Sequence, residues 1–116
     1  MSASIAGSPG LPNMSIYPAT KAAVISPGKT LAVELGGRRI RVDTISPGPI
    51  ATAALGMPGL PGELQKGIKE QFASQFVFKR MGKSYEVSKL VRFPVSQKSC
   101  FIAGDGVTID RGIRLN

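Results

Sequence analysis

Tyr17 and Lys21, two residues with complementary acid–base chemistry, stand four positions apart in the sequence. On a helix, this spacing places both side chains on one face and one turn apart. A phenol ordinarily gives up its proton only at about pH 10, and a neighbouring ammonium stabilises the phenolate. The pair therefore favours Tyr17 as a general acid or base. Considered alone, the same spacing also fits a solvated helix face.

Two other stretches carry groups that suit the same kind of reaction. Ser4 lies thirteen residues before Tyr17, and its hydroxyl can donate or accept a hydrogen bond. Residues 47–52 read PGPIAT and follow a run of branched side chains. Glycine carries no Cβ, so such a backbone can approach a flat ligand closely. Taken one at a time, Ser4 also fits a turn cap and Pro47–Pro49 also fits the end of a strand.

The element that must position Tyr17 and Lys21 is a predicted helix over residues 15–35, with Ser15 as its N-cap. The apolar residues that can share one face are Ile16, Ala19, Ala23, Leu31 and Leu35. Pro27–Gly28 interrupts this helix, because an interior proline costs about 3 kcal/mol and glycine about 1 kcal/mol. We therefore expect a kink or a break there, and an end at Gly36–Gly37.

Extended segments are expected on both sides of this helix. Residues 1–7 are typical of the tail of a buried strand that runs into a Gly/Ser/Pro loop. Residues 39–45 alternate and are rich in branched side chains, and residues 107–109 form a last short strand. Strands that alternate with helices predict an α/β fold with parallel pairing.

Two more helices are predicted between the last two strands. The first covers residues 62–77, and its apolar stripe indicates a packing face. That stripe consists of Leu64, Ile68, Phe72 and Phe76. The second covers residues 84–93, with Ser84 as N-cap. The order is strand–helix–strand–helix–helix–strand within one small domain.

Composition and charge argue against several classes of site. The chain has 116 residues, with 15 Lys and Arg against 7 Asp and Glu, but its basic residues are scattered. We expect a solvated basic surface, no nucleic-acid site and no membrane segment. Cys100 is the only cysteine and histidine is absent, so a zinc site is not expected. We expect Cys100 to be buried and the protein to be cytoplasmic.

Three ordered motifs together resemble the short-chain dehydrogenase/reductase family. They are Ser4, the Tyr17–Lys21 pair and residues 41–52, which read RVDTISPGPIAT. Residues 79–82 and 104–112 are further landmarks of the family. The resemblance covers essentially the whole chain. It implies an α/β fold with a partial Rossmann-like doubly wound parallel sheet.

The resemblance also implies a role for each matching residue. Tyr17 is the implied acid or base that exchanges a proton with the substrate oxygen, and Lys21 holds the nicotinamide ribose beside it. Ser4 is the implied hydrogen-bond partner of the substrate carbonyl or hydroxyl. The residues implied to embrace the nicotinamide ring are Pro47, Gly48, Ile50 and Thr52. Residues 53–78 are the implied lid over the substrate.

The chain departs from the family pattern in identifiable places. The family's glycine-rich phosphate loop and the asparagine of its preceding helix have no counterpart here. Arg111 stands where the family usually has a glycine. We therefore expect residues 1–116 to be the C-terminal, catalytic and substrate half of the family domain. The sequence does not distinguish NAD from NADP, because that choice is normally made near the second strand.

The implied activity is hydride transfer between NAD or NADP and a small carbonyl or alcohol substrate, without a metal. Another chain or segment would have to supply the cofactor-binding half. The missing strands would leave a sheet edge exposed, so we expect a homo-oligomer or pairing with a full-length relative. The alternative is a catalytically inert remnant, or an interaction module that docks on full-length relatives. A nucleic-acid binder, the third hypothesis, rests on charge alone.

Overall fold

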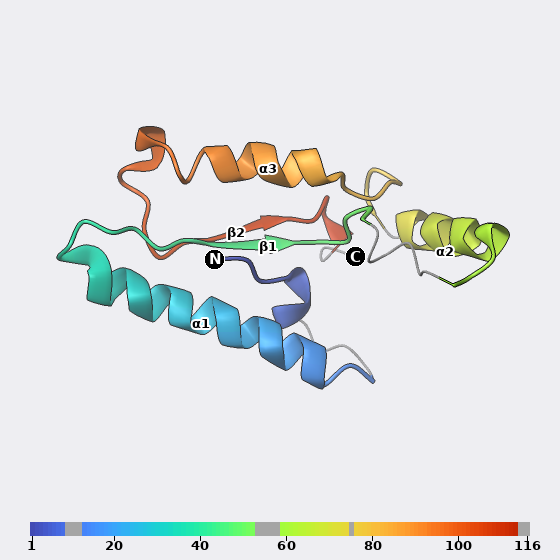
Figure 1. Cartoon of the computed structure of the whole chain (residues 1–116), viewed down its shortest axis with the longest axis horizontal. Helices are drawn as coiled ribbons and strands as arrows, with labels where there is room; N and C mark the ends of the chain where they lie inside the picture. Colours follow the sequence, from blue (N-terminus) through green and yellow to red (C-terminus); the bar gives the residue numbers. More distant parts are fainter. Residues whose placement is uncertain (9–12, 53–58, 75, 114–116) are drawn as a thin grey trace.

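The computed structural model describes residues 1–8, 13–52, 59–74 and 76–113. Two short strands lie at the centre of the described part, with helices on both sides. Figure 1 shows α1 and α3 on opposite sides of the strands and α2 projecting beyond one end of them. The elements are the 3-10 helix η1 (Ile5–Gly7), α1 (Ile16–Gly36), β1 (Thr44–Pro47), α2 (Gly62–Ser74), α3 (Ser84–Arg92), the 3-10 helix η3 (Gln97–Ser99) and β2 (Gly106–Ile109).

The strands are parallel, as predicted. β1 pairs with β2 in a register that sets Ile45 opposite Val107. Residues 1–3, the N-terminal segment, lie along the other edge of β1, where Ser2 forms a parallel bridge with Ile45. The Ala3 N–H donates to the Ile45 carbonyl at 2.8 Å. The predicted α/β class with parallel pairing is therefore confirmed.

The strand boundaries differ from those predicted. β1 begins at Thr44, whereas the alternating pattern predicted a strand over 39–45. Arg39, at a φ of 58°, still belongs to the turn after α1. The Arg41 guanidinium donates to the Asp43 carboxylate and to the Ile102 carbonyl, both at 3.1 Å, so side-chain bonds fix the stretch before β1. The strand predicted through residue 7 is likewise wrong beyond Ser4, because Ile5–Gly7 forms η1.

The α1 helix is continuous, so of the predicted kink or break at Pro27–Gly28 the break is wrong. Pro27 is exposed and Gly28 is buried. A Cβ on Gly28 would lie 2.5 Å from Thr44 Oγ1, so glycine allows α1 to pack directly against β1. This contact offsets the weak helix propensity of the two residues. Ser15 occupies the predicted N-cap position, but its side chain makes no capping hydrogen bond.

The two shorter helices lie close to their predicted positions. α2 ends at Ser74 instead of residue 77, so Phe76 lies beyond it. Leu64 is exposed, which shows that the predicted stripe is not buried along its whole length. The Phe72 side chain lies outside the described residues. α3 has Lys83 at its N-cap instead of Ser84, because the Glu86 carboxylate accepts the Lys83 N–H at 2.8 Å.

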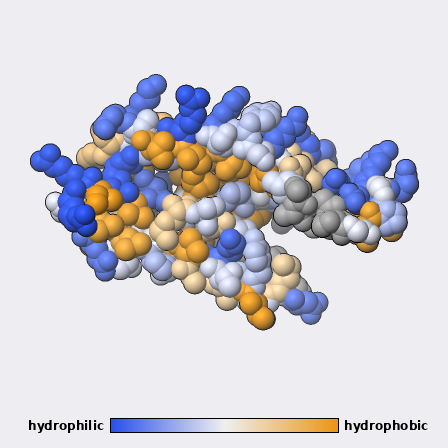
Figure 2. All heavy atoms as spheres, viewed as in Figure 1, coloured by the Kyte–Doolittle hydropathy of each residue, from blue (hydrophilic) through white to orange (hydrophobic). Residues whose placement is uncertain are grey.

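The buried core is small and centres on β1. Figure 2 shows apolar residues gathered along the side of α3 that faces the strands. Apart from Gly28 and Gly82, the buried residues in the described part are Ala3, Ala6, Thr44, Ile45, Ser46, Phe76 and Ser99. Several large apolar side chains remain exposed, among them Val33 and Phe101.

Cys100 is exposed, so its predicted burial is wrong. The preceding residue, Ser99, takes the interior position instead and is 1% exposed. The Ser99 hydroxyl lies 3.0 Å from the carbonyl oxygens of Phe93, Pro94 and Ser96. These bonds close the turn after α3 and direct the next side chain outward.

Candidate active site

Tyr17 and Lys21 lie in the first two turns of α1. The Lys21 ammonium is 5.6 Å from the centroid of the Tyr17 ring. Tyr17 is 47% exposed, and Lys21 is half-buried. The phenol is therefore accessible to a ligand and has a positive charge beside it.

Ser4 directly follows the N-terminal segment, in extended backbone, and its Oγ accepts the Ala6 N–H at 3.2 Å. This bond uses one acceptor position and leaves the hydroxyl proton available for donation. The η1 helix that follows is packed directly on α1. A Cβ on Gly7 would lie 2.9 Å from the Lys21 carbonyl carbon and 2.9 Å from the Ala22 nitrogen. Glycine thus holds the Ser4 segment against the helical turn that carries Lys21.

Residues 47–52 are held on two sides. The Gly48 N–H donates to the Ile109 carbonyl at 2.9 Å, and a Cβ on Gly48 would lie 2.9 Å from the Asp110 Cα. On the other side, Ile50 forms a parallel bridge with Gly82. Ala51 and Thr52 are exposed beyond this bridge. The backbone of the predicted cofactor-contacting stretch is therefore held by hydrogen bonds at Gly48, Pro49 and Ala51, and its last two residues are exposed to solvent.

Ser4, residues 47–52 and the start of α1 all lie toward the carboxyl ends of the strands. Since Ser2 pairs with Ile45, Ser4 is level with Pro47, two residues further along each chain. Figure 1 shows α1 running opposite to β1, so the α1 end that carries Tyr17 lies at the carboxyl end of the strands. In open α/β sheets, ligands bind at the carboxyl ends of the strands.

A second tyrosine–lysine pair has the same spacing on another helix. Tyr85 lies in the first turn of α3, and the Lys89 ammonium is 5.1 Å from its ring centroid. Lys83 is also near, at 5.9 Å. This pair is on the opposite side of the strands from α1 (Figure 1). The four-residue spacing therefore does not by itself identify the reactive tyrosine.

Sequence reasoning missed an ionic cluster near residues 47–52, the predicted cofactor-contacting stretch. The Glu86 carboxylate accepts hydrogen bonds from both terminal nitrogens of Arg80, at 2.8 and 2.7 Å. It also accepts one from a terminal nitrogen of Arg111, at 2.8 Å. Hydrogen bonds from Arg80, and then from the Lys83 N–H, hold the pKa of Glu86 below its ordinary value. Six residues separate Arg80 from Glu86 and twenty-five separate Glu86 from Arg111, so no helical spacing signals the cluster.

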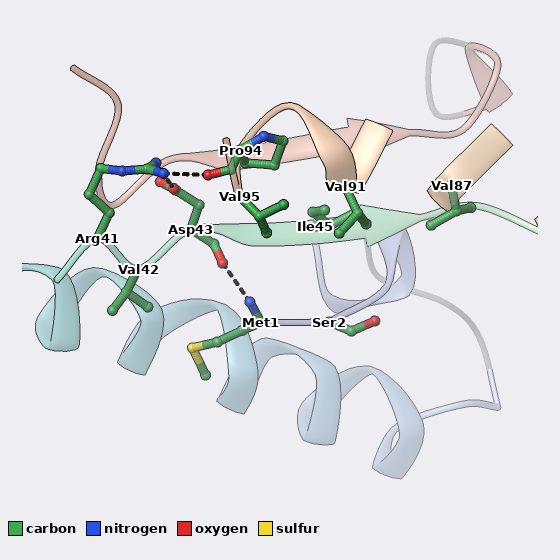
Figure 3. A pocket seen from close by; sticks show the side chains of 10 residues that line it. All are labelled: Met1, Ser2, Arg41, Val42, Asp43, Ile45, Val87, Val91, Pro94 and Val95. Carbon is green, nitrogen blue, oxygen red and sulfur yellow. Dashed lines mark hydrogen bonds and ion pairs between the residues drawn. The ribbon is translucent and has the colours of Figure 1, made fainter. Parts of the chain in front are cut away.

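A groove of about 380 Å³ lies between the N-terminal segment and α3. Figure 3 shows valine side chains from α3 and the turn after it facing Met1, Ser2 and Ile45 across the groove. Its lining residues are Met1, Ser2, Arg41, Val42, Asp43, Ile45, Val87, Val91, Pro94 and Val95. Tyr17, Lys21 and Ser4 do not line it. The groove is therefore a mainly apolar hollow separate from Tyr17, Lys21 and Ser4.

Two further findings concern the described residues alone. Their His, Cys, Asp and Glu side chains form no group that could hold a metal ion. Their helices include none with the length and hydropathy needed to cross a membrane.

Comparisons with known proteins identify the family of the chain. The profile of the family described as Enoyl-(Acyl carrier protein) reductase matches residues 1–114. A 3-oxoacyl-[acyl-carrier-protein] reductase of Thermotoga maritima is 36% identical over 110 residues, which are 95% of this chain and 42% of the relative. The chain belongs to the short-chain dehydrogenase/reductase family.

Solved structures of short-chain dehydrogenases share its fold. A family member from Francisella tularensis superposes with a TM-score of 0.86 at 27% identity, over 99% of this chain and 50% of that one. L-sorbose reductase from Gluconobacter frateurii, solved with NADPH and L-sorbose, gives a TM-score of 0.88 at 30% identity, over 97% and 45%. This chain thus spans half or less of the length of these relatives. The predicted Rossmann-like class is confirmed.

Proposed function

We propose that this chain supplies the proton-transfer and nicotinamide-contacting half of an oxidoreductase that uses NAD or NADP. The observation that carries the proposal is the exposed Tyr17 phenol with the Lys21 ammonium 5.6 Å from its ring centroid. Gly7, three residues after Ser4, packs on the turn of α1 that carries Lys21. The family's oxidoreductase chemistry supports the proposal. The substrate class is a small carbonyl compound or the corresponding alcohol.

The chain's own groups account for the proton in this reaction. When bound, the reduced nicotinamide supplies a hydride to the carbonyl carbon. Tyr17 donates its proton to the carbonyl oxygen, which leaves an alcohol and a tyrosinate. The Lys21 ammonium stabilises that anion. Ser4 donates its hydroxyl proton as a hydrogen bond to the substrate oxygen and so orients it.

The residues at the carboxyl ends of the strands fit the nicotinamide end of the cofactor. Lys21 and Tyr17 present donors for ribose hydroxyls, and Pro47 and Gly48 offer a backbone that a flat ring can approach. Ile50 and Thr52 would contact the ring and its carboxamide. The adenosine end requires other residues, because a glycine-rich phosphate loop is absent from the sequence.

A cofactor-binding half, in the same polypeptide or in another one, would complete the site. Met1 C=O and Ala3 N–H bond to β1, so the backbone groups of the exposed Ser2 point to the other edge of the N-terminal segment. Such an edge can pair with a further strand. The groove lined by Val87, Val91 and Val95 adjoins this edge (Figure 3) and could receive an apolar side of the added half.

The same groove and edge favour one alternative function. A catalytically inert form of the chain could dock on a full-length relative or on a second copy through them. In that case the chain would bind its partner without turnover. A reducing compartment such as the cytoplasm suits either form, since Cys100 is an exposed thiol.

Reconstitution tests the proposal against this alternative. The chain is mixed or co-expressed with the cofactor-binding half of the Thermotoga maritima relative, and NADH and NADPH oxidation is followed with a panel of small ketones. Turnover that requires both halves and is lost in Tyr17→Phe supports the enzyme. A tight complex that binds NADPH but turns over no ketone, or turnover that Tyr17→Phe leaves unchanged, contradicts it.

A further inference from the structure

Glu86 gathers donors from three separate segments. The stretch just after the implied lid contributes Arg80, which binds through both terminal nitrogens, and the start of α3 contributes the Lys83 N–H. The turn after β2 contributes Arg111, at 2.8 Å. We call Arg80, Glu86 and Arg111 the Glu86 clasp. A two-pronged arginine–carboxylate bond has a fixed geometry, so the clasp sets where the three segments lie relative to one another.

The residues adjacent to the clasp hold the backbone of residues 48–51. Gly82, between Arg80 and Glu86, donates its N–H to the Pro49 carbonyl at 3.1 Å and accepts the Ala51 N–H at 2.8 Å. A Cβ on Gly82 would lie 2.5 Å from Ile50 Cδ1, so a larger residue here would displace the Ile50 side chain. Asp110, next to Arg111, packs against Gly48 from the other side. Both supports of the stretch therefore adjoin clasp residues.

Arg111 also connects the clasp to the end of the implied lid. Its guanidinium carbon is 5.1 Å from the centroid of the Phe78 ring, a cation–π distance. The Arg111 backbone has a φ of 52°, a left-handed conformation that glycine adopts without strain. The side-chain bonds to Glu86 and Phe78 offset that strain. Nearby, Phe76 is 1% exposed and lines a hollow of about 30 Å³ together with Ile50, Glu86 and Arg111.

We infer that Glu86 is a positioning residue. It acts through Gly82 and Asp110 on the backbone of residues 48–51, which the proposed function sets against the nicotinamide. Through Arg111 it also fixes Phe78, at the end of the implied lid. The role assigned to that backbone rests on the proposed function, whereas the mechanical coupling does not.

Amide hydrogen exchange of the full chain, followed by NMR, tests the coupling. Glu86→Gln removes the carboxylate charge but keeps the side-chain size. The Ala51 and Gly82 amides should exchange about tenfold faster, because bonds to a charged acceptor are lost from their support. The Thr44 and Gly104 amides, which donate to Asp105 and Val42 at the other end of the strands, serve as references and should not change.

Arg111 variants keep the test decisive even if Glu86→Gln fails to fold. Arg111→Gly relieves the left-handed backbone and removes one tie, so Ala51 should exchange about threefold faster in a folded chain. Arg111→Lys should retain most of the protection, and Glu34→Gln on α1 is the charge control. Equal acceleration at the reference amides, or none at Ala51 and Gly82, would overturn the inference. Turnover is not the readout, so this failure is distinct from failure of the Tyr17 assignment.

Discussion

The two tyrosine–lysine pairs of this protein have the same local geometry but different surroundings. Tyr17 on α1 is 47% exposed and Tyr85 on α3 is 50% exposed. Their lysine partners four residues on lie 5.6 and 5.1 Å from the ring centroids. Both tyrosines stand in the first turn of a helix that begins near the carboxyl ends of the strands (Figure 1).

The tertiary contacts around the two tyrosine–lysine pairs differ. Gly7 presses the segment that carries Ser4 against the Lys21 turn of α1. On α3, the residue after Tyr85 is Glu86, whose carboxylate is bound by Arg80 and Arg111. The segment that carries Ser4 therefore leads into a contact with the Lys21 turn, whereas Tyr85 is followed directly by a carboxylate bound to two arginines. A residue spacing defines a candidate site, and tertiary contacts decide which candidate can do chemistry.

The largest expected effect comes from removing the two phenol hydroxyls in turn. In the reconstituted enzyme, Tyr17→Phe should lower kcat by about 10²- to 10⁴-fold, the range typical of general acid–base catalysis. Tyr85→Phe is the matched control and should leave kcat unchanged. Steady-state kinetics with NADPH and a small ketone measure both. Similar losses in the two variants would remove the distinction between the pairs.

Replacing the two lysine partners should also lower kcat for the α1 pair only, but by less than replacing Tyr17. The Lys21 ammonium lies 5.6 Å from the centroid of the Tyr17 ring, and solvent exposure weakens charge interactions of this kind. We expect Lys21→Met to lower kcat by about 10- to 100-fold and Lys89→Met to have no effect. A larger loss in Lys89→Met than in Lys21→Met would contradict the assignment.

The contact that distinguishes the α1 pair can be tested through stability. In Gly7→Ala, the new Cβ would meet the α1 backbone at 2.9 Å. Such overpacking should lower the free energy of unfolding by about 1–3 kcal/mol. Gly36→Ala, at an α1 position with open space around it, should raise that free energy by about 0.5–1 kcal/mol. Thermal unfolding followed by circular dichroism compares the two, and an unchanged Tm in Gly7→Ala would show that η1 is not packed on α1.

The smallest effect concerns the pH dependence of the ionic cluster. Arg80 and the Lys83 N–H hold the pKa of Glu86 below its ordinary value, and the side chains of Arg111, Lys83 and Asp110 also face this region. A carboxyl with a lowered pKa in the folded state stabilises that state above its unfolded pKa, about 4.3. The contribution is lost as pH falls through the lowered value. Urea unfolding should therefore separate the native chain from Glu86→Gln at pH 7 and bring them together at strongly acidic pH, whereas a constant gap would contradict the charge-based account.

Local patterns in the sequence predicted much of the fold. Residue spacing placed the three helices close to their observed bounds, and the alternation of strands and helices predicted the parallel pairing. The errors arose where a contact between distant residues overrides local preference. Gly28 sits beside Thr44, so α1 continues through Pro27, and Ser99 takes the interior position predicted for Cys100.

The candidate site was predictable to the extent that its members are neighbours in sequence. The Tyr17–Lys21 spacing indicated a shared face, and the resemblance to a family supplied Ser4 and residues 47–52. The Glu86–Arg111 bond spans twenty-five residues and depends on how the turn after β2 meets α3. The packing of Gly7 on α1 is also tertiary, so neither contact follows from residue spacing.

The most direct measurement is a titration of the isotope-labelled chain with reduced nicotinamide mononucleotide, which carries only the nicotinamide end of the cofactor. We predict chemical-shift changes at the backbone amides of Ala6, Lys21 and Ala51, and none at Tyr85 or Lys89. Shifts centred on Tyr85, or no shift at Lys21 and Ala51 at saturating ligand, would contradict the placement of the nicotinamide site.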